Sequence, residues 1–264
     1  MAYFERLGER RFRATEHTGG AWDLETQHIA PALGLMAHAV ETDRDRRRSD
    51  GLVLTRVSYD ILGTVPIAEV DIGVEVLRKG RTIELVEAVL SNAGRAAVRL
   101  RGWLMEPRDT TAVAGSSHPP IPGPDELEAW DPTTVWRGGF IASVEVRRHQ
   151  QEHGRACYRV RTPQPLLADE EVSRMAAVTG LLDVANGMTV RAEPTDVLFP
   201  NVDLTAHFFA QPQGEWLGLD TTVSFGSDGV GLTTSVIHDE RGPVGTSSQC
   251  LTVRPTSQGP GSSS

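Results

Sequence analysis

The sequence predicts an α+β protein in which a helix followed by an antiparallel four-strand meander occurs twice. Three observations lead to this prediction. Four short segments rich in β-branched and aromatic residues fill positions 201–254, and turn sequences starting at Pro212, Ser227 and Glu240 separate them. Apolar residues recur at helical spacing just before these segments, over 169–186. The same order, a helix and then strands, is found over 29–105.

The helix expected over 169–186 belongs to the sheet that follows it in the chain. Asp169 is placed to cap its first turn, because a short carboxylate accepts hydrogen bonds from the free amides there. Gly187 is placed to end the helix. Since a helix and a meander must each bury an apolar face, we expect the sheet to pack against this helix.

The first half of the chain is expected to begin with a strand pair, or a strand with a turn, over 3–15. Residues 29–40 predict a helix that is apolar almost all round and therefore buried on most sides, with Pro31 in its first turn. The charged run at 43–50 is expected to be a solvated loop, with phosphate binding as an alternative. Strands follow over 52–105, separated by turns at Gly63, Gly80 and Gly94.

The two halves repeat each other in the spacing of their turns. Corresponding turn glycines are almost equally spaced, Gly80 and Gly94 in the first half and Gly229 and Gly242 in the second. By this count Arg101 occupies the position equivalent to Gln249. Two similar units indicate a duplication, and their edge strands can pair into one continuous sheet.

We therefore divide the chain into an N-terminal unit at 1–106 and a C-terminal unit at 136–255. The segment 107–135 is rich in Pro, Gly, Ser and Asp, which is typical of a partly disordered linker that crosses the surface. The tail at 256–264 consists only of small and polar residues, and we expect it to be disordered.

The composition, 39% hydrophobic and 23% charged, is ordinary for a globular protein. The net charge of −9 argues against nucleic acid or an anionic membrane as the main partner. No run approaches the roughly 18 apolar residues that span a bilayer, so no membrane insertion is expected, and no signal peptide is visible. Cys157 and Cys250 both lie in predicted strands, which favours buried free thiols in a reducing cytoplasm. We therefore expect a cytoplasmic protein.

Two buried polar residues could carry chemistry. Asp183 lies beside the apolar stripe of its helix, where a lone charge is costly unless it is paired or neutral. The alternative for it is a carboxylate tied to backbone near the helix end. Gln249 lies among apolar neighbours on one face of the last strand, and a primary amide can orient a water molecule or a thioester carbonyl. Its alternative is an ordinary buried hydrogen-bonding residue.

Asn201 is the third candidate, because it opens a strand from which its side chain can reach the helix end. Its alternative is a turn residue after Pro200. Asp203 and His207 share its face of the strand, and a His–Asp dyad is a further alternative. The sequence contains no nucleophile elbow, P-loop, dinucleotide fingerprint or metal-ligand cluster, so neither a cofactor nor a metal is expected.

Three segments in order resemble the double-hotdog acyl-CoA thioesterases, namely 182–187, 201–207 and 242–253. The resemblance is to the type II bacterial and peroxisomal enzymes and their actinobacterial thioesterase-like relatives. It covers nearly the whole chain and is strongest over 166–254. It implies a double hotdog, two tandem units each with a long central helix wrapped by a curved antiparallel sheet. Because such sheets leave edges and helix faces to cover, we also expect a homo-oligomer.

The resemblance implies a site as well. In the family, an Asp on the second helix, a Ser or Thr opening the next strand and a Gln on the last strand orient the attacking water. By position these are Asp183, Asn201 and Gln249. Asn201 departs from the family pattern, because an amide replaces a hydroxyl and cannot serve as a nucleophile, although it can still hold a water molecule. The implied function is hydrolysis of an acyl-CoA or related thioester in fatty acid metabolism, with Asp183 as the general base.

The acyl chain is expected to lie in an apolar tunnel between helix and sheet, with backbone amides at a helix start steadying the thioester oxygen. Two other functions stay open. The chain could be a non-catalytic binder of acyl-CoA or lipid, which Asn201 in place of a hydroxyl makes plausible. A hydratase or dehydratase on the same scaffold needs an Asp and a His a few residues apart at a helix start, and the sequence has no such pair near either helix.

Overall fold

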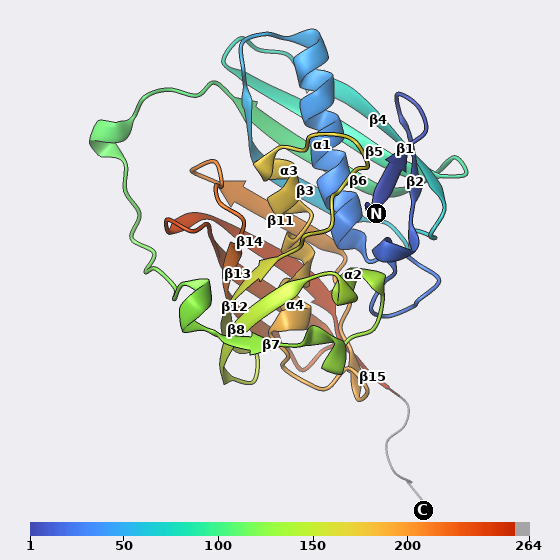
Figure 1. The fold of residues 1–264 in the computed structure, drawn as a ribbon, viewed down its shortest axis with the longest axis vertical. Coiled ribbons are helices and arrows are strands. Elements are labelled where there is room, and N and C mark those ends of the chain that lie inside the picture. Colours follow the sequence, from blue (N-terminus) through green and yellow to red (C-terminus); the bar gives the residue numbers. More distant parts are fainter. Residues whose placement is uncertain (257–264) are drawn as a thin grey trace, which may run out of the picture.

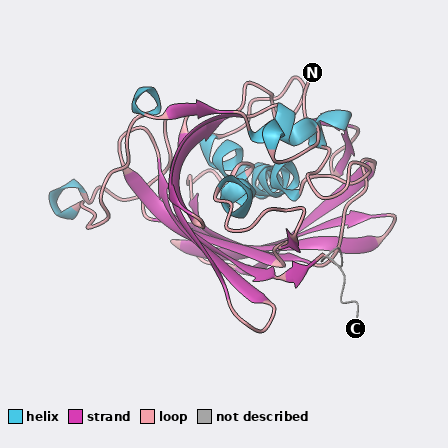
Figure 2. Ribbon diagram, turned by 90° about the horizontal axis from the view of Figure 1, so that it is seen from below, coloured by secondary structure: helices cyan, strands magenta, loops and turns pink. Residues whose placement is uncertain are grey.

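The computed structural model describes residues 1–256, and the predicted disordered tail lies outside this range except for its first residue. Within it, thirteen strands form one antiparallel sheet that curves around the helices (Figures 1 and 2). The strands of this sheet are β1 (Phe4–Arg6), β2 (Arg11–Ala14), β3 (Val53–Ile61), β4 (Glu69–Arg78), β5 (Ile83–Asn92), β6 (Arg95–Met105), β7 (Glu128–Trp130), β8 (Glu145–Glu152), β9 (Arg155–Arg161), β11 (Asp203–Phe208), β12 (Leu217–Phe225), β13 (Val230–His238) and β14 (Pro243–Thr252). A separate short pair joins β10 (Val197–Leu198) to β15 (Arg254–Pro255).

The six strands on one side of the junction between β3 and β11 have counterparts in the same order on the other side, where β7 is one additional edge strand. The full order is β1-β2-β4-β5-β6-β3-β11-β14-β13-β12-β9-β8-β7, so β3 and β11, the first strands of the two predicted meanders, lie side by side in the sheet. The halves join where β3 pairs with β11, for example at Asp60 with Asp203 and at Ser58 with Thr205. The predicted continuous sheet is therefore confirmed. The predicted four-strand meanders are wrong in their pairing: β4-β5-β6 and β12-β13-β14 are three-strand meanders, and β3 and β11 pair with the last strand of each, β6 and β14, instead of with the next strand.

Strand pairing gives the correspondence between the halves directly. Gly102 of β6 pairs with Val86 as Gln249 of β14 pairs with Thr233, and corresponding residues are 147 positions apart. The predicted equivalence of Arg101 with Gln249 is therefore wrong by one residue. Between the register shift and the turn, the β5–β6 hairpin has two residue pairs, whereas the β13–β14 hairpin has one. Counting from the turn glycine is therefore off by one residue, and a shift of one residue along a strand moves the side chain to the opposite face of the sheet.

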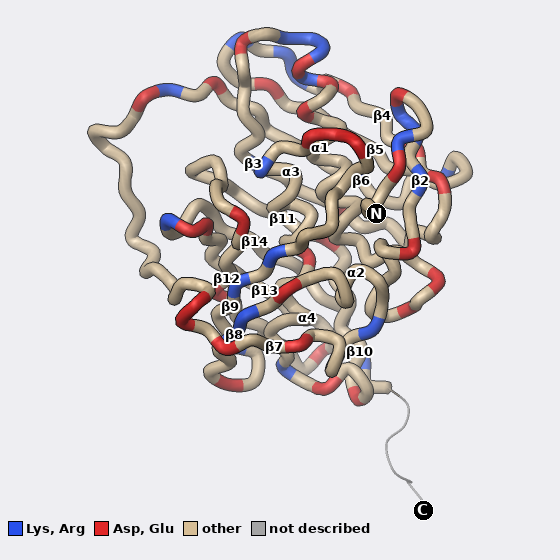
Figure 3. Tube along the Cα trace, in the orientation of Figure 1, with Lys and Arg blue, Asp and Glu red and all other residues tan. Residues whose placement is uncertain are grey.

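Helix α1 (Ile29–Arg47) is buried along most of its length and is longer than predicted, because residues 43–47 of the charged run continue it; only 48–50 leave the helix as predicted. Arginines near its end are held by carboxylates: Arg47 and Arg48 each lie 2.8 Å from Glu84, and Arg46 lies 2.7 Å from Glu9. Figure 3 shows these basic residues at one end of α1, with acidic residues beside them. Basic side chains also suit the negative end of the helix dipole. This pairing leaves little basis for the phosphate-binding alternative.

The second central helix is broken into short pieces: α3 (Arg174–Thr179), the 3-10 turn η5 (Leu182–Val184) and α4 (Ala185–Met188). It starts later than predicted. Asp169 has a left-handed backbone with φ 58°, which a helix cannot contain, and Ser173 caps α3 instead by accepting a hydrogen bond from the amide of Ala176. Gly180 ends α3, so the residues that follow are set at a new angle in η5.

The two central helices cross at a pair of glycines. A Cβ atom added to Gly34 of α1 would lie 2.8 Å from the Cα of Gly180 and 2.8 Å from the carbonyl oxygen of Ala176. A Cβ added to Gly180 would lie 3.4 Å from Gly34, an ordinary contact. The absence of a side chain at position 34 is therefore what allows the helices to approach this closely.

The segment predicted as a linker follows the surface, as Figure 1 shows, and contains short structured pieces. These are η2 (Thr111–Val113), η3 (Pro124–Glu126), β7 and η4 (Pro132–Thr134), after which α2 (Gly139–Ala142) leads into β8; one further 3-10 turn, η1 (Glu16–Thr18), lies near the N-terminus. Cys157 is buried as predicted, but Cys250 is exposed, because alternation along β14 turns its side chain away from Gln249. None of the helices in residues 1–256 is long and apolar enough to cross a membrane.

Candidate active site

The structure brings together the three side chains that the sequence nominates. Asp183, in η5, accepts a hydrogen bond at Oδ1 from the Nδ2 atom of Asn201 at 2.7 Å and from the Nε2 atom of Gln249 at 2.9 Å. Asp183 is only 6% exposed and Gln249 only 1%. Residues 66 positions apart in the chain thus share one buried carboxylate oxygen. The alternative for Asp183, a carboxylate tied to local backbone, does not describe these contacts.

The pKa of Asp183 is raised to about 7. Burial is the largest cause, because the charged form loses its water; the hydrogen bonds from Asn201 and Gln249 favour the charged form and lower the pKa, but by less. A carboxyl group with a pKa near neutrality can accept a proton and release it again at physiological pH.

The position of each amide follows from its strand. Gln249 faces inward from β14, opposite Thr233 of β13, and its Oε1 atom is buried without a hydrogen-bond partner among residues 1–256. Asn201 lies just before β11 and bridges to Leu251, which sets its side chain toward η5. Its Nδ2 atom also donates to the carbonyl of Asp203 at 3.0 Å, so the turn interpretation is correct in part.

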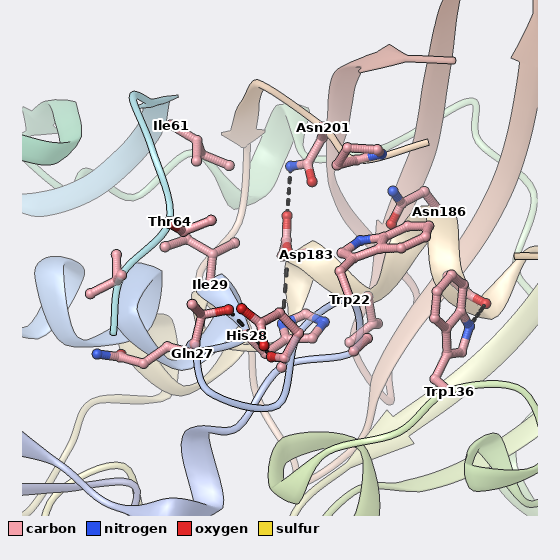
Figure 4. Close-up of a pocket in the computed structure, with 18 of the residues that line it drawn as sticks. Trp22, Gln27, His28, Ile29, Ile61, Thr64, Trp136, Asp183, Asn186 and Asn201 are labelled. Atoms are coloured by element: carbon pink, nitrogen blue, oxygen red, sulfur yellow. Dashed lines mark hydrogen bonds and ion pairs between the residues drawn. The ribbon is translucent and has the colours of Figure 1, made fainter. Parts of the chain in front are cut away.

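A cavity of about 320 Å³ opens beside these residues. Asp183 and Asn201 line it, together with Asn186 and Gly187 of the second half. The first half supplies the facing wall through 20–29 and 61–65, and Trp136 closes one side (Figure 4). Much of the remaining wall is apolar, namely Trp22, Ile29, Ile61, Leu62, Val65, Ile141 and Met188. The cavity therefore combines one buried acid with a lining suited to a hydrocarbon group.

His28, which was not among the residues predicted from the sequence, also lines this cavity. Its Nδ1 atom lies 3.8 Å from Oδ2 of Asp183, the carboxylate oxygen that the two amides leave free. Burial lowers the pKa of His28 to about 4, so the ring is neutral at pH 7. His28 and Asp183 are far apart in the sequence, so no short spacing marks them as a pair; the fold brings the start of α1 to the second helix. A signal was present, since His28 immediately precedes the predicted helix.

The other sequence-based alternative does not form. His207 is exposed, and within residues 1–256 neither a hydrogen bond nor an ion pair joins it to Asp203. The carboxylate of Asp203 instead accepts a hydrogen bond from the backbone amide of Cys250 at 2.6 Å. The part of the chain that the structure describes has no group of three or more His, Cys, Asp or Glu residues placed to hold a metal ion.

Comparisons with known proteins follow the same division of the chain. Residues 18–105 match the family model of the acyl-CoA thioesterase N-terminal domain, and residues 113–253 match the model of the acyl-CoA thioesterase C-terminal domain. Together the two matches cover most of the chain, in the order in which the models are named. The search of curated proteins found no match.

Solved structures share the fold at low sequence identity. A conserved hot dog fold protein of unknown function from Alicyclobacillus acidocaldarius superposes with a TM-score of 0.75 at 13% identity, covering 95% of each chain. A putative thioesterase from Novosphingobium aromaticivorans has a TM-score of 0.73 at 17% identity, covering 96% of this chain and 99% of the other. The acyl-CoA thioesterase II TesB2 from Mycobacterium marinum has a TM-score of 0.70 at 16% identity, covering 96% of each. These similarities identify a hotdog fold.

Proposed function

Because this chain belongs to the acyl-CoA thioesterase family, we propose that it hydrolyses an acyl-CoA thioester to a free acid and coenzyme A by direct attack of water. The observation that carries the proposal is the convergence of Asn201 and Gln249 on one oxygen of Asp183 at the edge of the cavity. This arrangement fixes a general base beside a space that an acyl group can enter.

In the proposed reaction, the two oxygens of Asp183 have different tasks. The amides of Asn201 and Gln249 donate to Oδ1, so they fix the orientation of the carboxylate and stabilise its charged form. Oδ2 then takes a proton from water while the water oxygen attacks the thioester carbon. When the tetrahedral intermediate collapses, the carbon–sulfur bond breaks, and the proton on Asp183 passes to the departing coenzyme A thiolate. The carboxylate is then ready for another turnover.

Gln249 supplies a second contact for the attacking water. Its Oε1 atom is buried and free of hydrogen bonds within residues 1–256, so it can accept one proton of a water molecule whose other proton points at Asp183. Asn201 serves the carboxylate through its Nδ2 atom, a donation that a Ser or Thr hydroxyl also makes. The replacement of a hydroxyl by an amide at this position is therefore compatible with a base-assisted mechanism, because no nucleophile is required there.

The proposal extends to the division of the chain and to the position of the acyl group. We assign two tandem hotdog units to residues 1–106 and 136–255, joined by the linker 107–135, and we place the acyl chain against the apolar wall formed by Trp22, Ile61 and Met188. The corresponding order of strands on the two sides of the β3–β11 junction supports the assignment of two similar units. A cytoplasmic homo-oligomer acting in fatty acid metabolism is the setting that we expect for such an enzyme.

The test is hydrolysis of acyl-CoA substrates of increasing chain length by the purified protein, followed by detection of the released thiol. We expect turnover that depends on chain length and that both Asp183→Asn and Gln249→Ala reduce. Unchanged activity in the two variants would refute the site assignment. Tight binding of an acyl-CoA without turnover would instead indicate the non-catalytic binder.

The approach of His28 to Asp183 gives a hydratase on an enoyl thioester as a second candidate, since an Asp–His pair is what that reaction needs. Loss of the enoyl absorbance without release of thiol would identify it. Release of thiol from saturated acyl-CoA would exclude it as the main activity.

A further inference from the structure

The start of α1 offers few free amides to a ligand. The amide of Ala30 donates to Nδ1 of His28 at 3.2 Å, and Pro31 has no amide hydrogen. A helix start with its amides free can stabilise a developing negative charge, but here the histidine ring and the proline remove two of the donors. A side chain near the same place can supply a donor in their stead.

His28 is the side chain in that place, and its ring has a defined orientation. The backbone amide of His28 donates to the carbonyl of Thr18 at 2.7 Å, which holds the loop before α1 against the helix start. The ring packs on Phe140, with 4.5 Å between the ring centres. The hydrogen bond from the amide of Ala30 to Nδ1 is a third restraint on the orientation of the ring. A donor held this firmly needs little rearrangement during a reaction.

The hydrogen bonds also decide which nitrogen of the ring carries the proton. Nδ1 accepts from Ala30, so in the neutral ring the proton is on Nε2. Burial keeps the ring neutral at pH 7. No residue within 1–256 accepts a hydrogen bond from Nε2, and the ring lines the cavity. His28 thus has one unused donor in the space that the proposed function gives to the thioester.

The distance from Asp183 suits a donor to the carbonyl oxygen. Oδ2 of Asp183 lies 3.8 Å from Nδ1, and Nε2 lies on the far side of the ring from the cap. With about 3 Å from the base oxygen to the water and about 3 Å from the water to the attacked carbon, an in-line arrangement places the carbonyl carbon and its oxygen about 6 Å from the base. A donor on the same ring as Nδ1 can therefore reach that oxygen while Asp183 Oδ2 holds the water.

We propose that His28 is a catalytic residue that donates a hydrogen bond from Nε2 to the carbonyl oxygen of the thioester. This inference rests on the proposed thioester hydrolysis. As water attacks, negative charge grows on that oxygen, and the donor stabilises it without giving up its proton. His28 then supplies the stabilisation that free amides would supply at an uncapped helix start.

The test uses His28→Ser, because serine can still cap α1 as Ser173 caps α3, but cannot reach the carbonyl oxygen. We expect kcat to fall about 10²–10³-fold, as when one such donor is removed, with KM changed less than about threefold. The melting temperature should stay within about 2 °C of the unmodified protein. His38→Gln is the matched control, since His38 is a buried histidine that lies 3.3 Å from Glu170 and does not line the cavity, and the activity of this variant should be unchanged.

A spectroscopic measurement separates this role from the hydrolysis itself. Bound to Asp183→Asn, an acyl-CoA labelled with ¹³C at its carbonyl should show a carbonyl stretching frequency lower than in water-free solvent, and adding His28→Ser should raise it. An unchanged kcat in His28→Ser, an unchanged frequency, or a loss of activity explained by a falling melting temperature would each overturn the assignment. Absence of thioester hydrolysis by the unmodified protein would instead refute the proposed function, whatever the carbonyl frequency.

Discussion

The two halves of the molecule share a strand order and a register, but they differ at the few inward positions that matter for chemistry. Gln249 in the second half corresponds to Gly102 in the first, and Asn201, which bridges to Leu251, corresponds to Leu54, which pairs with Leu104. Asp183 lies three residues beyond the glycine crossing, where α1 has the fully buried Ala37. The first half thus has an apolar interior at every position where the second has an acid or an amide.

This difference shows how burial and function divide between the halves. Burying a carboxylate and two amides costs free energy that an apolar core does not, and the raised pKa of Asp183 records that cost. In the second half, the buried polar groups that carry this cost are gathered beside one cavity. The first half contributes packing, the opposite wall of the cavity and His28, so the site is complete only where the halves meet.

The largest effect should come from removing the acid that the first half lacks. Asp183→Asn keeps the shape of the side chain but cannot accept a proton from water, so kcat should fall about 10²–10⁴-fold. Steady-state hydrolysis of an acyl-CoA measures this, and circular dichroism checks that the fold is retained. A variant with more than a tenth of the original kcat would show that Asp183 is not the base.

Converting the second half toward the first should have the next largest effect. In Asn201→Leu and Gln249→Gly, each position takes the residue found at its counterpart, and Asp183 loses one donor to its charged form. We expect kcat to fall about 10–10²-fold and the midpoint of the pH–rate curve to move upward, because the pKa of Asp183 rises when a donor is lost. Asn201→Thr keeps a donor and is the control, expected to stay within about threefold. An equal loss in all three variants would contradict this account.

The pH dependence should follow the pKa of Asp183, which is about 7. Below pH 7 the carboxyl group is protonated, so kcat should fall about tenfold per pH unit and level off above pH 8. Because the folded protein binds this proton more tightly than the unfolded chain does, the group stabilises the fold at low pH and loses that contribution, of about 4 kcal/mol, between pH 4 and 7. Asp183→Asn should therefore raise the melting temperature at pH 8 and hardly change it at pH 4. The opposite pattern would mean that the carboxylate is ionised throughout.

The smallest effect concerns the crossing of the helices, where the halves are not interchangeable. Gly34→Ala places a methyl group against the backbone of Gly180 and Ala176 and should lower the free energy of unfolding by about 1–3 kcal/mol. Gly180→Ala makes only an ordinary contact and should change it by less than about 1 kcal/mol. Chemical denaturation of both variants measures the difference, and similar losses would show that the crossing is symmetric.

Sequence patterns located most of the strands and the three polar residues, because alternation and turn chemistry are local, but the short strands β7, β10 and β15 were missed. They were insufficient wherever the outcome depended on distant contacts. Residues 43–47 continue α1, where Glu84 of β5 holds Arg47 and the adjoining Arg48. Arg101 faces outward because a shift in strand pairing comes one residue later than in the other half. His28 could not be assigned because its partner Asp183 is far away in the chain and meets it only through the fold.

The connection between the halves has a practical consequence. Within residues 1–256, the hydrogen bonds made by residues 107–118 reach no farther than Glu106, whereas Arg159 and His238 hold the carbonyls of the chain from Pro119 onward. A protease that cuts this exposed stretch would leave β3 hydrogen-bonded to β11 and α1 packed against the second central helix. The nicked product should behave as one particle in size-exclusion chromatography, and a fluorescent tag or an affinity handle spliced in here should leave turnover intact.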